Sequence, residues 1–365
     1  MNDKITVMLV DDSSVIRRAL SRIIETDKDI EVISSVSNGE MAVSMAKIKK
    51  PNVVLLDVEM PVMDGLTALP KILEVSPDTK VIMCSSLTAK GADTTIKAMT
   101  LGAVESIVKP SSAKETGAGS DFETNLIMLI KALGSKKHSI MPKPVSYSSS
   151  NAQPKTAKPA PVEQSYTLKK DIPAFRPNPK ILAIGSSTGG PNALFKVLKN
   201  IGEINVPIVI TQHMPATFTA ILAKHIKQNT GLEAYEAEEG MVVEAGKVYV
   251  AQGGKHMLFK MDGDQLKIKL DEGAQENFCK PAVDPMLRSL IEIYGSKILC
   301  VILTGMGQDG LKSASILSEK GGQVIAQDKE TSVVWGMPGA VAVAGICEKV
   351  LPIDDIAKAI KNVIK

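Results

Sequence analysis

A serine framed by glycines is the first feature of this sequence that could do chemistry. Ser187 lies between Gly185 and Gly189 in the stretch ILAIGSSTGGP, where an apolar run leads into a Gly-x-Ser-x-Gly turn. Glycines at the flanking positions permit the strained strand-to-helix turn that holds a serine hydroxyl clear of the backbone. The neighbouring Ser186 lies off-centre in this frame, so Ser187 is the favoured nucleophile. A hydroxyl still needs a base to accept its proton at neutral pH.

A histidine and a carboxylate that could activate Ser187 follow later apolar runs. His213 follows residues 207–211 in the segment TQHMP, and Asp309 lies in the glycine turn LTGMGQDG after residues 298–304. If the runs are parallel strands, their ends share one edge of a sheet, where nucleophile, base and carboxylate would meet. The imidazole would take the serine proton, and the carboxylate would hold the right tautomer. Backbone amides of the glycine turns could bind an oxyanion.

Other residues compete for the roles of base and carboxylate. His256 follows the Gly-Gly turn in AQGGKHM and is the main rival base, although it could instead line a substrate cleft. His225 falls in a helical pattern, and His138 lies in a proline-rich segment. Asp284 precedes a proline and an apolar run, which is typical of a helix N-cap with proline at the first helical position. The histidine and aspartate that directly follow buried strands are therefore preferred.

A second polar cluster is expected in the N-terminal part of the chain. Asp11 and Asp12, then Asp57, Ser85 and Lys109 (followed by Pro110) lie at the ends of successive strand-like runs. Three carboxylates at one edge repel one another unless a cation lies between them, and oxygen ligands favour Mg²⁺. The lysine and the hydroxyl would surround a position for a phosphoryl group. Asp12 could also be a helix N-cap, but capping does not explain Asp57 and Lys109.

The elements that position these residues alternate strand-like and helical patterns in both halves of the chain. The strand-like runs are residues 5–10, 53–56, 81–84 and 106–108, then 180–184, 207–211, 247–251, 298–304 and 323–326. This rhythm predicts the α/β class, with two doubly wound parallel-sheet domains whose sheets carry helices on both faces. A length of 365 residues also favours two cores.

The region between the two halves is rich in proline, serine and lysine. We therefore expect a first domain over residues 1–133, a flexible linker over 134–178 and a second domain over 179–365. The basic residues of the linker suit a solvated tether better than an anionic partner.

Composition and missing motifs exclude several function classes. A net charge of +3 and 3% aromatic residues give no support for nucleic-acid binding, and the helical pattern over 310–320 has only two basic residues. Neither Gly-x-Gly-x-x-Gly nor Gly-Lys-Ser/Thr occurs at a strand end. The four cysteines form no Cys-x-x-Cys pair, which favours free thiols. No signal peptide or membrane-spanning run is found, so we expect a cytoplasmic protein without membrane insertion.

The first domain resembles the response-regulator receiver family. The segments LVDDSSVIRR, LLDVEMPVMDG and SIVKP carry the resemblance, together with the hydroxyl at Ser85. It implies a flavodoxin-like fold in which Asp57 accepts phosphate from a histidine kinase. It also implies a site around Mg²⁺ made of Asp11, Asp12, Asp57, the backbone carbonyl of Glu59, Ser85 and Lys109. Ser106 replaces the aromatic residue that receivers often carry three positions before the lysine, which makes an aromatic switch doubtful.

The second domain resembles the catalytic domain of the chemotaxis methylesterase family, CheB. The segments IGSSTGGP, ITQHMP, VYVAQGGKHM, VDPML, VILTGMGQDG and VVWGMPGA carry this resemblance. It implies a Rossmann-like three-layer hydrolase that needs no cofactor, with Ser187 as nucleophile, His213 as general base and acid, Asp309 as orienting carboxylate and the Met306 amide as oxyanion donor. The implied substrates are glutamate methyl esters on the cytoplasmic helices of chemoreceptors, and glutamines there as a deamidase. Gln308 stands where the family commonly has asparagine.

Joining the two domains predicts regulation by phosphorylation. We expect the unphosphorylated receiver to cover the hydrolase cleft, and phosphorylation of Asp57 to weaken that contact; a coupling of about 1–3 kcal/mol is sufficient. The alternative is a non-catalytic response regulator whose second domain binds receptors or nucleic acid. The sequence does not rank esterase against deamidase activity.

Overall fold

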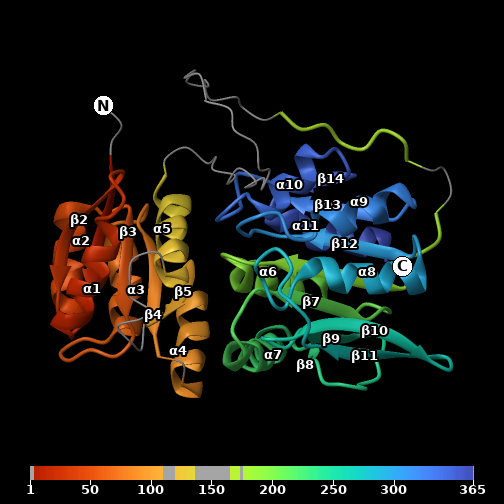
Figure 1. Ribbon diagram of the computed structural model, residues 1–365, viewed down its shortest axis with the longest axis horizontal. Helices are drawn as coiled ribbons and strands as arrows, with labels where there is room; N and C mark the ends of the chain where they lie inside the picture. The colour runs from red at the N-terminus through yellow and green to blue at the C-terminus, as the bar shows by residue number, and fades with distance from the viewer. Residues whose placement is uncertain (1–3, 87, 110–119, 136–164, 173–175, 365) are drawn as a thin grey trace, which may run out of the picture.

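The chain forms two α/β domains that lie side by side (Figure 1). The computed structural model describes residues 4–86, 88–109, 120–135, 165–172 and 176–364. Each domain is built around a parallel sheet with helices on both faces, which confirms the predicted α/β class. No helix in the described ranges is long and apolar enough to cross a bilayer.

The first domain contains a five-stranded parallel sheet in the order β2-β1-β3-β4-β5. Its strands are β1 (Ile5–Val10), β2 (Ile30–Val36), β3 (Val53–Asp57), β4 (Lys80–Ser85) and β5 (Glu105–Val108). Its helices are α1 (Ser14–Ile24), α2 (Gly39–Lys49), α3 (Gly65–Val75), α4 (Ala89–Thr100) and α5 (Asp121–Gly134). Helices α1 and α5 cover one face, and α2, α3 and part of α4 cover the other. Strand β2 was not predicted.

The second domain contains a seven-stranded parallel sheet in the order β14-β13-β12-β6-β7-β9-β8, and an antiparallel hairpin of β10 and β11. The strands are β6 (Ile181–Ser186), β7 (Ile208–Gln212), β8 (Glu233–Glu236), β9 (Lys247–Val250), β10 (His256–Asp262), β11 (Gln265–Asp271), β12 (Ile298–Ile302), β13 (Gln323–Gln327) and β14 (Lys349–Leu351). The helices are α6 (Gly190–Ile201), α7 (Ala216–Thr230), α8 (Val283–Tyr294), α9 (Leu311–Glu319), α10 (Met337–Val343) and α11 (Ile353–Val363).

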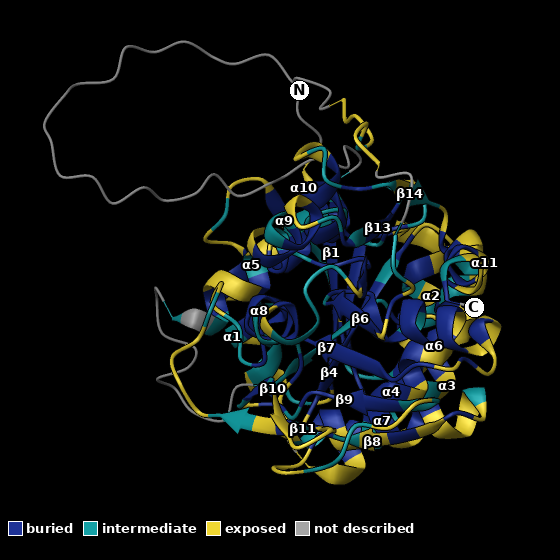
Figure 2. Ribbon diagram, turned by 90° about the vertical axis from the view of Figure 1, so that its right-hand side faces the viewer, coloured by how far each residue is buried: buried dark blue, intermediate teal, exposed yellow. Residues whose placement is uncertain are grey.

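The central strands of both sheets are buried on both faces (Figure 2). Aliphatic runs such as ILAIGS in β6 and ILCVI in β12 are fully buried, as expected for parallel strands covered by helices on each side. In the second domain, α6, α7 and α11 pack on one face, and α8, α9, α10 and the hairpin pack on the other. The ends of β6, β7 and β12 are neighbours in this sheet, so the loops after them meet at one edge.

The described residues of the two domains are joined by contacts that include helix α4 and the cluster beneath α1 and α5. Helix α4 packs against α7 and α6, and its residues Ala92 and Ile96 belong to the same buried cluster as the core of the second domain. Asp93 pairs with His225 across this interface at 3.0 Å. Elsewhere, Val334 of the second domain is buried in the cluster beneath α1 and α5 of the first.

The segment between the domains is described only in part. The predicted domain boundaries stay predictions, and His138 and Pro110 lie outside the described residues. Two basic residues of the predicted tether contact the second domain. Lys169 Nζ donates to Ser318 Oγ at 2.9 Å, and Arg176 forms a half-buried ion pair with Glu348.

Candidate active site

Ser187 lies in a turn between β6 and α6, as the glycine frame predicts. Its backbone amide donates to the carbonyl of Thr304, and its own carbonyl accepts from the Gly190 amide. Gly189 has φ +75°, a left-handed conformation that glycine adopts without strain. The Ser187 side chain is partly exposed, whereas Ser186 is fully buried and donates to Gln212 at 2.7 Å. Of the two serines, only Ser187 is therefore accessible to a substrate.

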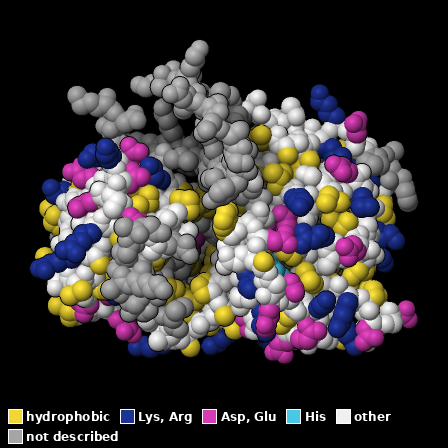
Figure 3. Space-filling model, in the orientation of Figure 1, with side chains coloured by type: hydrophobic (Ala, Val, Ile, Leu, Met, Phe, Trp, Pro, Cys, Tyr) yellow, Lys and Arg dark blue, Asp and Glu magenta, His cyan; other side chains and the backbone are white. Residues whose placement is uncertain are grey.

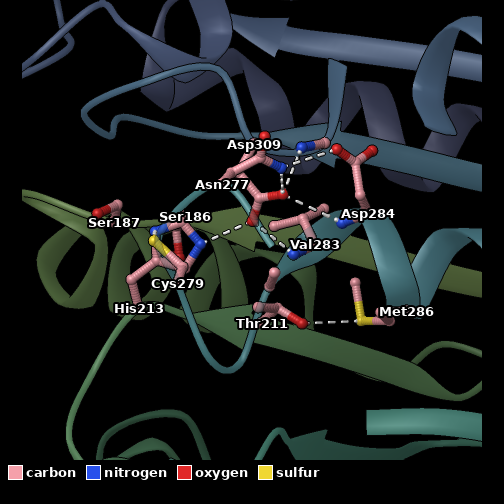
Figure 4. Close-up of polar contacts among 12 residues, drawn as sticks. Ser186, Ser187, Thr211, His213, Asn277, Cys279, Val283, Asp284, Met286 and Asp309 are labelled. Carbon is pink, nitrogen blue, oxygen red and sulfur yellow. Dashed lines mark hydrogen bonds and ion pairs between the residues drawn. The ribbon is translucent and has the colours of Figure 1, made fainter. Parts of the chain in front are cut away.

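His213 and Asp309, which are 96 residues apart in the chain, meet at the edge where β7 and β12 end (Figure 4). His213 Nε2 and Asp309 Oδ2 are 2.8 Å apart, and both side chains are nearly buried. Among the described residues, the Ser187 hydroxyl makes no hydrogen bond to His213; Figure 4 shows it to one side of the bonded network. The structure thus brings together the predicted base and carboxylate, and places the predicted nucleophile beside them without that bond.

The Asp309 carboxylate is held by a shell of donors. Oδ2 also accepts from the Val283 amide, and Oδ1 accepts from the amides of Asp284 and Gly310. The side chain of Asn277 donates to Oδ1 at 2.7 Å. Burial disfavours the charged form, but these bonds and His213 together hold the pKa of Asp309 below its usual value. The carboxylate therefore stays ionised and fixed in orientation.

Asp284 does not cap helix α8, so the predicted N-cap is wrong. The N-cap is Ala282, and Asp284 is the second residue of the helix. Its buried carboxylate accepts from the Ser313 amide at the start of α9 and from the Asn277 side chain. Asp284 thus ties two helices together and shares Asn277 with Asp309.

A thiol that sequence reasoning missed contacts the other ring nitrogen of His213. Cys279 Sγ lies 3.4 Å from His213 Nδ1. Burial lowers the pKa of His213, but the interactions with Asp309 and Cys279 outweigh burial and raise it above its ordinary value. The imidazole is therefore stabilised in its charged form in this arrangement.

The rival histidines have other partners. His256 is buried, with Nε2 2.9 Å from the carbonyl of Ala274 and Nδ1 accepting from the Ala282 amide. Both of its ring nitrogens are therefore engaged by backbone. His225, which the sequence placed in a helix without a role, pairs with Asp93 of the first domain.

Gly305 and Met306 border the Ser187 turn from the loop after β12. A Cβ at Gly305 would lie 2.8 Å from the Ser187 Cβ, so the close approach of the two loops requires glycine there. The side chain of Met306 packs against a core cluster of the first domain. The predicted role of the Met306 amide as oxyanion donor stays a prediction.

The polar cluster predicted in the first domain forms where β1 and β3 end. Asp11, Asp12 and Asp57 each offer a carboxylate oxygen within 4.8 Å of the others, an arrangement that could hold a metal ion. Lys109 Nζ lies 2.7 Å from both Asp11 and Asp57. Burial raises the pKa of Asp57, with Lys109 opposing it. A divalent cation would stabilise the buried, charged carboxylate of Asp57 in the same way as the lysine does.

The remaining residues of that cluster lie around it. Ser85 is buried, and among the described residues its hydroxyl has no hydrogen-bond partner, as a donor awaiting a phosphoryl oxygen would. The Glu59 side chain points outward to Lys90 at 2.9 Å, so only its backbone is available to the cluster. The predicted roles of these residues in metal and phosphate binding stay predictions.

One acidic residue of the first domain lies near the Ser187 turn. Glu105 begins β5, is half-buried, and interacts with the side chain of Thr188, the residue after Ser187. Burial raises its pKa to about 7, although bonds from the Ser106 amide and Thr188, and the charge of His213, oppose the shift. Sequence reasoning did not single out Glu105, because nothing local marks it as an interface residue.

Comparisons with known proteins agree with this geometry. A family model described as "CheB methylesterase" matches residues 182–360, and one described as "Response regulator receiver domain" matches residues 7–117. The second domain is similar to the crystal structure of the Thermotoga maritima CheB methylesterase catalytic domain. The TM-score is 0.50 and the identity 43%, over 51% of this chain and 99% of that one.

Full-length relatives extend the similarity across both domains. A protein-glutamate methylesterase/protein-glutamine glutaminase 1 of Paramagnetospirillum magneticum is 49% identical, over 97% of this chain and 95% of the relative. A protein-glutamate methylesterase/protein-glutamine glutaminase of Azospirillum brasilense is 46% identical, over 99% of this chain and 93% of the relative. With such relatives along nearly its whole length, the chain belongs to the CheB methylesterase family and carries a receiver domain ahead of the methylesterase domain.

Proposed function

We propose that this protein is a phosphorylation-activated serine hydrolase that demethylates glutamate methyl esters on chemoreceptors and deamidates receptor glutamines. The observation that carries the proposal is the His213–Asp309 pair, which lies beside the partly exposed Ser187 at one sheet edge. The family membership, and the two activities in the relatives' names, support the same reaction. A domain that only binds a partner would not need an ionised carboxylate that accepts several hydrogen bonds and orients a histidine.

In the first half of the reaction, Ser187 Oγ attacks the carbonyl carbon of the ester, and its proton passes to His213. Because Asp309 engages Nε2, the nitrogen left for this proton is Nδ1. The negative charge on the carbonyl oxygen is stabilised by backbone amides, with that of Met306 the predicted donor. The intermediate then collapses, the imidazolium returns its proton to the leaving oxygen, and methanol departs from a glutamyl ester of Ser187.

In the second half, His213 takes a proton from water as the water oxygen attacks the acyl carbon. The bond to Ser187 breaks, the serine recovers its proton from the imidazolium, and a glutamate carboxylate is released. With glutamine as substrate the first leaving group is ammonia, and every later step is the same. A single triad therefore supports both activities, and the hydrolase domain needs no cofactor for either.

The receiver domain supplies control in this proposal. Asp57 takes a phosphoryl group from a chemotaxis histidine kinase, with Mg²⁺ held by Asp11, Asp12, Asp57 and the backbone carbonyl of Glu59. Ser85 and Lys109 bind the phosphoryl oxygens. The substrate would be the cytoplasmic helices of chemoreceptors, so the protein would act in the cytoplasm.

The docked arrangement of the domains supports this control. Glu105 of the receiver interacts with Thr188, the residue after Ser187, and Met306 packs against a core cluster of the receiver. A protein substrate that must reach Ser187 would compete with these contacts. Phosphorylation of Asp57 would weaken the docking and open the cleft.

The direct test of the catalytic assignment replaces the nucleophile. In Ser187→Ala we expect methanol release from a methyl-esterified receptor fragment to fall by about 10³-fold or more, as for loss of a triad nucleophile. Circular dichroism should show an unchanged fold. Ser186→Ala is the matched control, and it should keep most of its activity because Ser186 is buried. Full activity in Ser187→Ala, or equal loss in both variants, would contradict the assignment.

A further inference from the structure

A tight turn over residues 276–279 borders the proposed active site. Glu276 and Cys279 form an antiparallel bridge, with each backbone amide donating to the other's carbonyl at 3.1 Å and 2.9 Å. The two residues between them, Asn277 and Phe278, have φ values of +52° and +63°. Positive φ at both central positions defines a type I′ turn, which favours Asn followed by Gly.

Phe278 is the unusual residue of this turn. A bulky residue with positive φ is a steric outlier, and glycine would give the same turn without strain. The turn itself therefore gives no reason for phenylalanine. Packing gives none either, because 96% of the residue's surface is exposed, the highest exposure among the large apolar residues of the described ranges. Strain and exposure together indicate that Phe278 acts on something outside this chain.

The neighbours of Phe278 fix its place relative to the catalytic groups. Asn277 donates to Asp309 at 2.7 Å, and the thiol of Cys279 lies 3.4 Å from His213 (Figure 4). Phe278 lies between two residues that touch the predicted triad, so its side chain borders the site from the solvent side. Phe278 is exposed even though the receiver is docked on the hydrolase domain, so the described part of the receiver is not what Phe278 contacts.

A pocket lined mainly by polar and charged residues adjoins the same turn. It has a volume of about 690 Å³, and its lining includes Asn277, Gln308 and Lys312. An exposed aromatic ring next to a polar pocket suits an amphipathic polypeptide segment, with an apolar contact for one side chain and polar contacts for its neighbours. A lipid surface fits less well, because the pocket is lined by acidic and basic residues together, Glu276 and Asp284 with Arg288 and Lys312. Figure 3 likewise shows acidic and basic side chains interspersed on the face of the second domain that it presents.

We propose that Phe278 is a specificity-determining residue that docks the amphipathic polypeptide segment carrying the esterified glutamate. The inference rests on the proposed function, since it assumes an ester presented by a protein. Phe278 contacts residues of the substrate outside the reacting group. It should therefore affect binding of a protein ester and leave the hydrolysis of a small ester almost unchanged.

The test compares two substrates with the full-length protein, activated by acetyl phosphate and Mg²⁺. One substrate is a methyl-esterified chemoreceptor cytoplasmic fragment, and the other is the γ-methyl ester of N-acetylglutamate. In Phe278→Gly we expect KM for the receptor fragment to rise about tenfold, or roughly 1.4 kcal/mol of binding. Its kcat on the fragment, and its kcat/KM on the small ester, should stay within about threefold of the parent. Phe278→Tyr should restore the parent KM.

Controls separate docking from folding and from the reaction itself. Phe278→Gly should unfold at the same temperature as the parent or higher, because the strain is removed. Met261→Ala removes another exposed apolar side chain, on β10, and should leave both substrates unaffected. An unchanged KM in Phe278→Gly, or an equal loss on both substrates, would overturn the docking role. A parent protein that hydrolyses the small ester but releases no methanol from the receptor fragment would instead refute the proposed substrate.

Discussion

His213 has a different partner on each ring nitrogen, and this asymmetry decides how it can act. Asp309 engages Nε2 and fixes the ring, while Nδ1 faces the Cys279 thiol. A general base must be neutral to accept a proton, yet the interactions with Asp309 and Cys279 raise the pKa of His213 in this arrangement. In the proposed mechanism, the contact with Cys279 competes with Ser187 for Nδ1 and favours the charged imidazole, which cannot act as the base.

Removing the thiol should make the base available at lower pH. The Cys279 interactions raise the pKa of His213, so in Cys279→Ala that pKa falls. The acid limb of the rate profile should then move to lower pH. The expected shift is about one pH unit, because a hydrogen bond to a charged group contributes roughly 1.4 kcal/mol. The pH profile of kcat/KM on a small ester, with phosphodonor present, measures this shift. Cys279→Ser should give a smaller shift, and an acid limb at the parent's position in both variants would refute the argument.

The sequence located the residues at the strand ends better than it located their neighbours. Ser187, His213 and Asp309 were predicted from local glycine turns and apolar runs, and the structure brings the last two into contact; their roles stay predictions. Cys279 and Asn277 were not predicted. Their positions depend on a turn with Phe at a left-handed position, which no local rule would indicate.

At the scale of elements, the buried parallel strands were predictable and the exposed ones were not. Strands such as β6 and β12 are continuous apolar runs, so their pattern was clear. The hairpin of β10 and β11 was missed, although its alternating residues flank a two-residue turn, Gly263-Asp264, that gave a usable signal. The short edge strands β8 and β14 have too few apolar residues to stand out.

Strand β5 gives the receiver a titratable contact with the hydrolase domain. Glu105 has its pKa raised to about 7 by burial in the docked state, above the ordinary value of 4.5 for a glutamate. A raised pKa means that docking favours the protonated carboxyl. Its contribution to docking is thus complete below about pH 4.5 and is lost as the pH rises through 7. The unphosphorylated domains should therefore separate more readily at pH 8 than at pH 6.

The variant Glu105→Gln tests this contact, because glutamine mimics the protonated acid at every pH. We expect the radius of gyration of the unphosphorylated parent, measured by small-angle X-ray scattering, to increase between pH 6 and pH 8. That of Glu105→Gln should increase less. Asp93→Asn is the matched control, because it removes the charge partner of His225 at the same interface. This variant should keep the part of the increase in radius of gyration that is due to Glu105. Equal pH dependence in Glu105→Gln and the parent would contradict the role of Glu105.

At the scale of the whole molecule, the proposed control requires the receiver site and the hydrolase site to communicate through the contacts between the domains. The receiver's acidic cluster lies where β1 and β3 end, while its contacts with the hydrolase domain include α4, β5 and the cluster beneath α1 and α5. Lys109 is the link between the two, because it pairs with Asp57 and follows directly after β5. A phosphoryl group on Asp57 would change the partners of Lys109 and so the position of the strand that carries Glu105.

The most direct test of this account measures methanol release from a methyl-esterified receptor fragment, with and without acetyl phosphate and Mg²⁺. The parent protein should be stimulated about 5- to 150-fold, the range expected for a coupling of about 1–3 kcal/mol. Asp57→Ala should keep the unstimulated rate and show no response to the phosphodonor. Equal stimulation of Asp57→Ala and the parent, or no methanol from either protein, would contradict receiver-controlled ester hydrolysis.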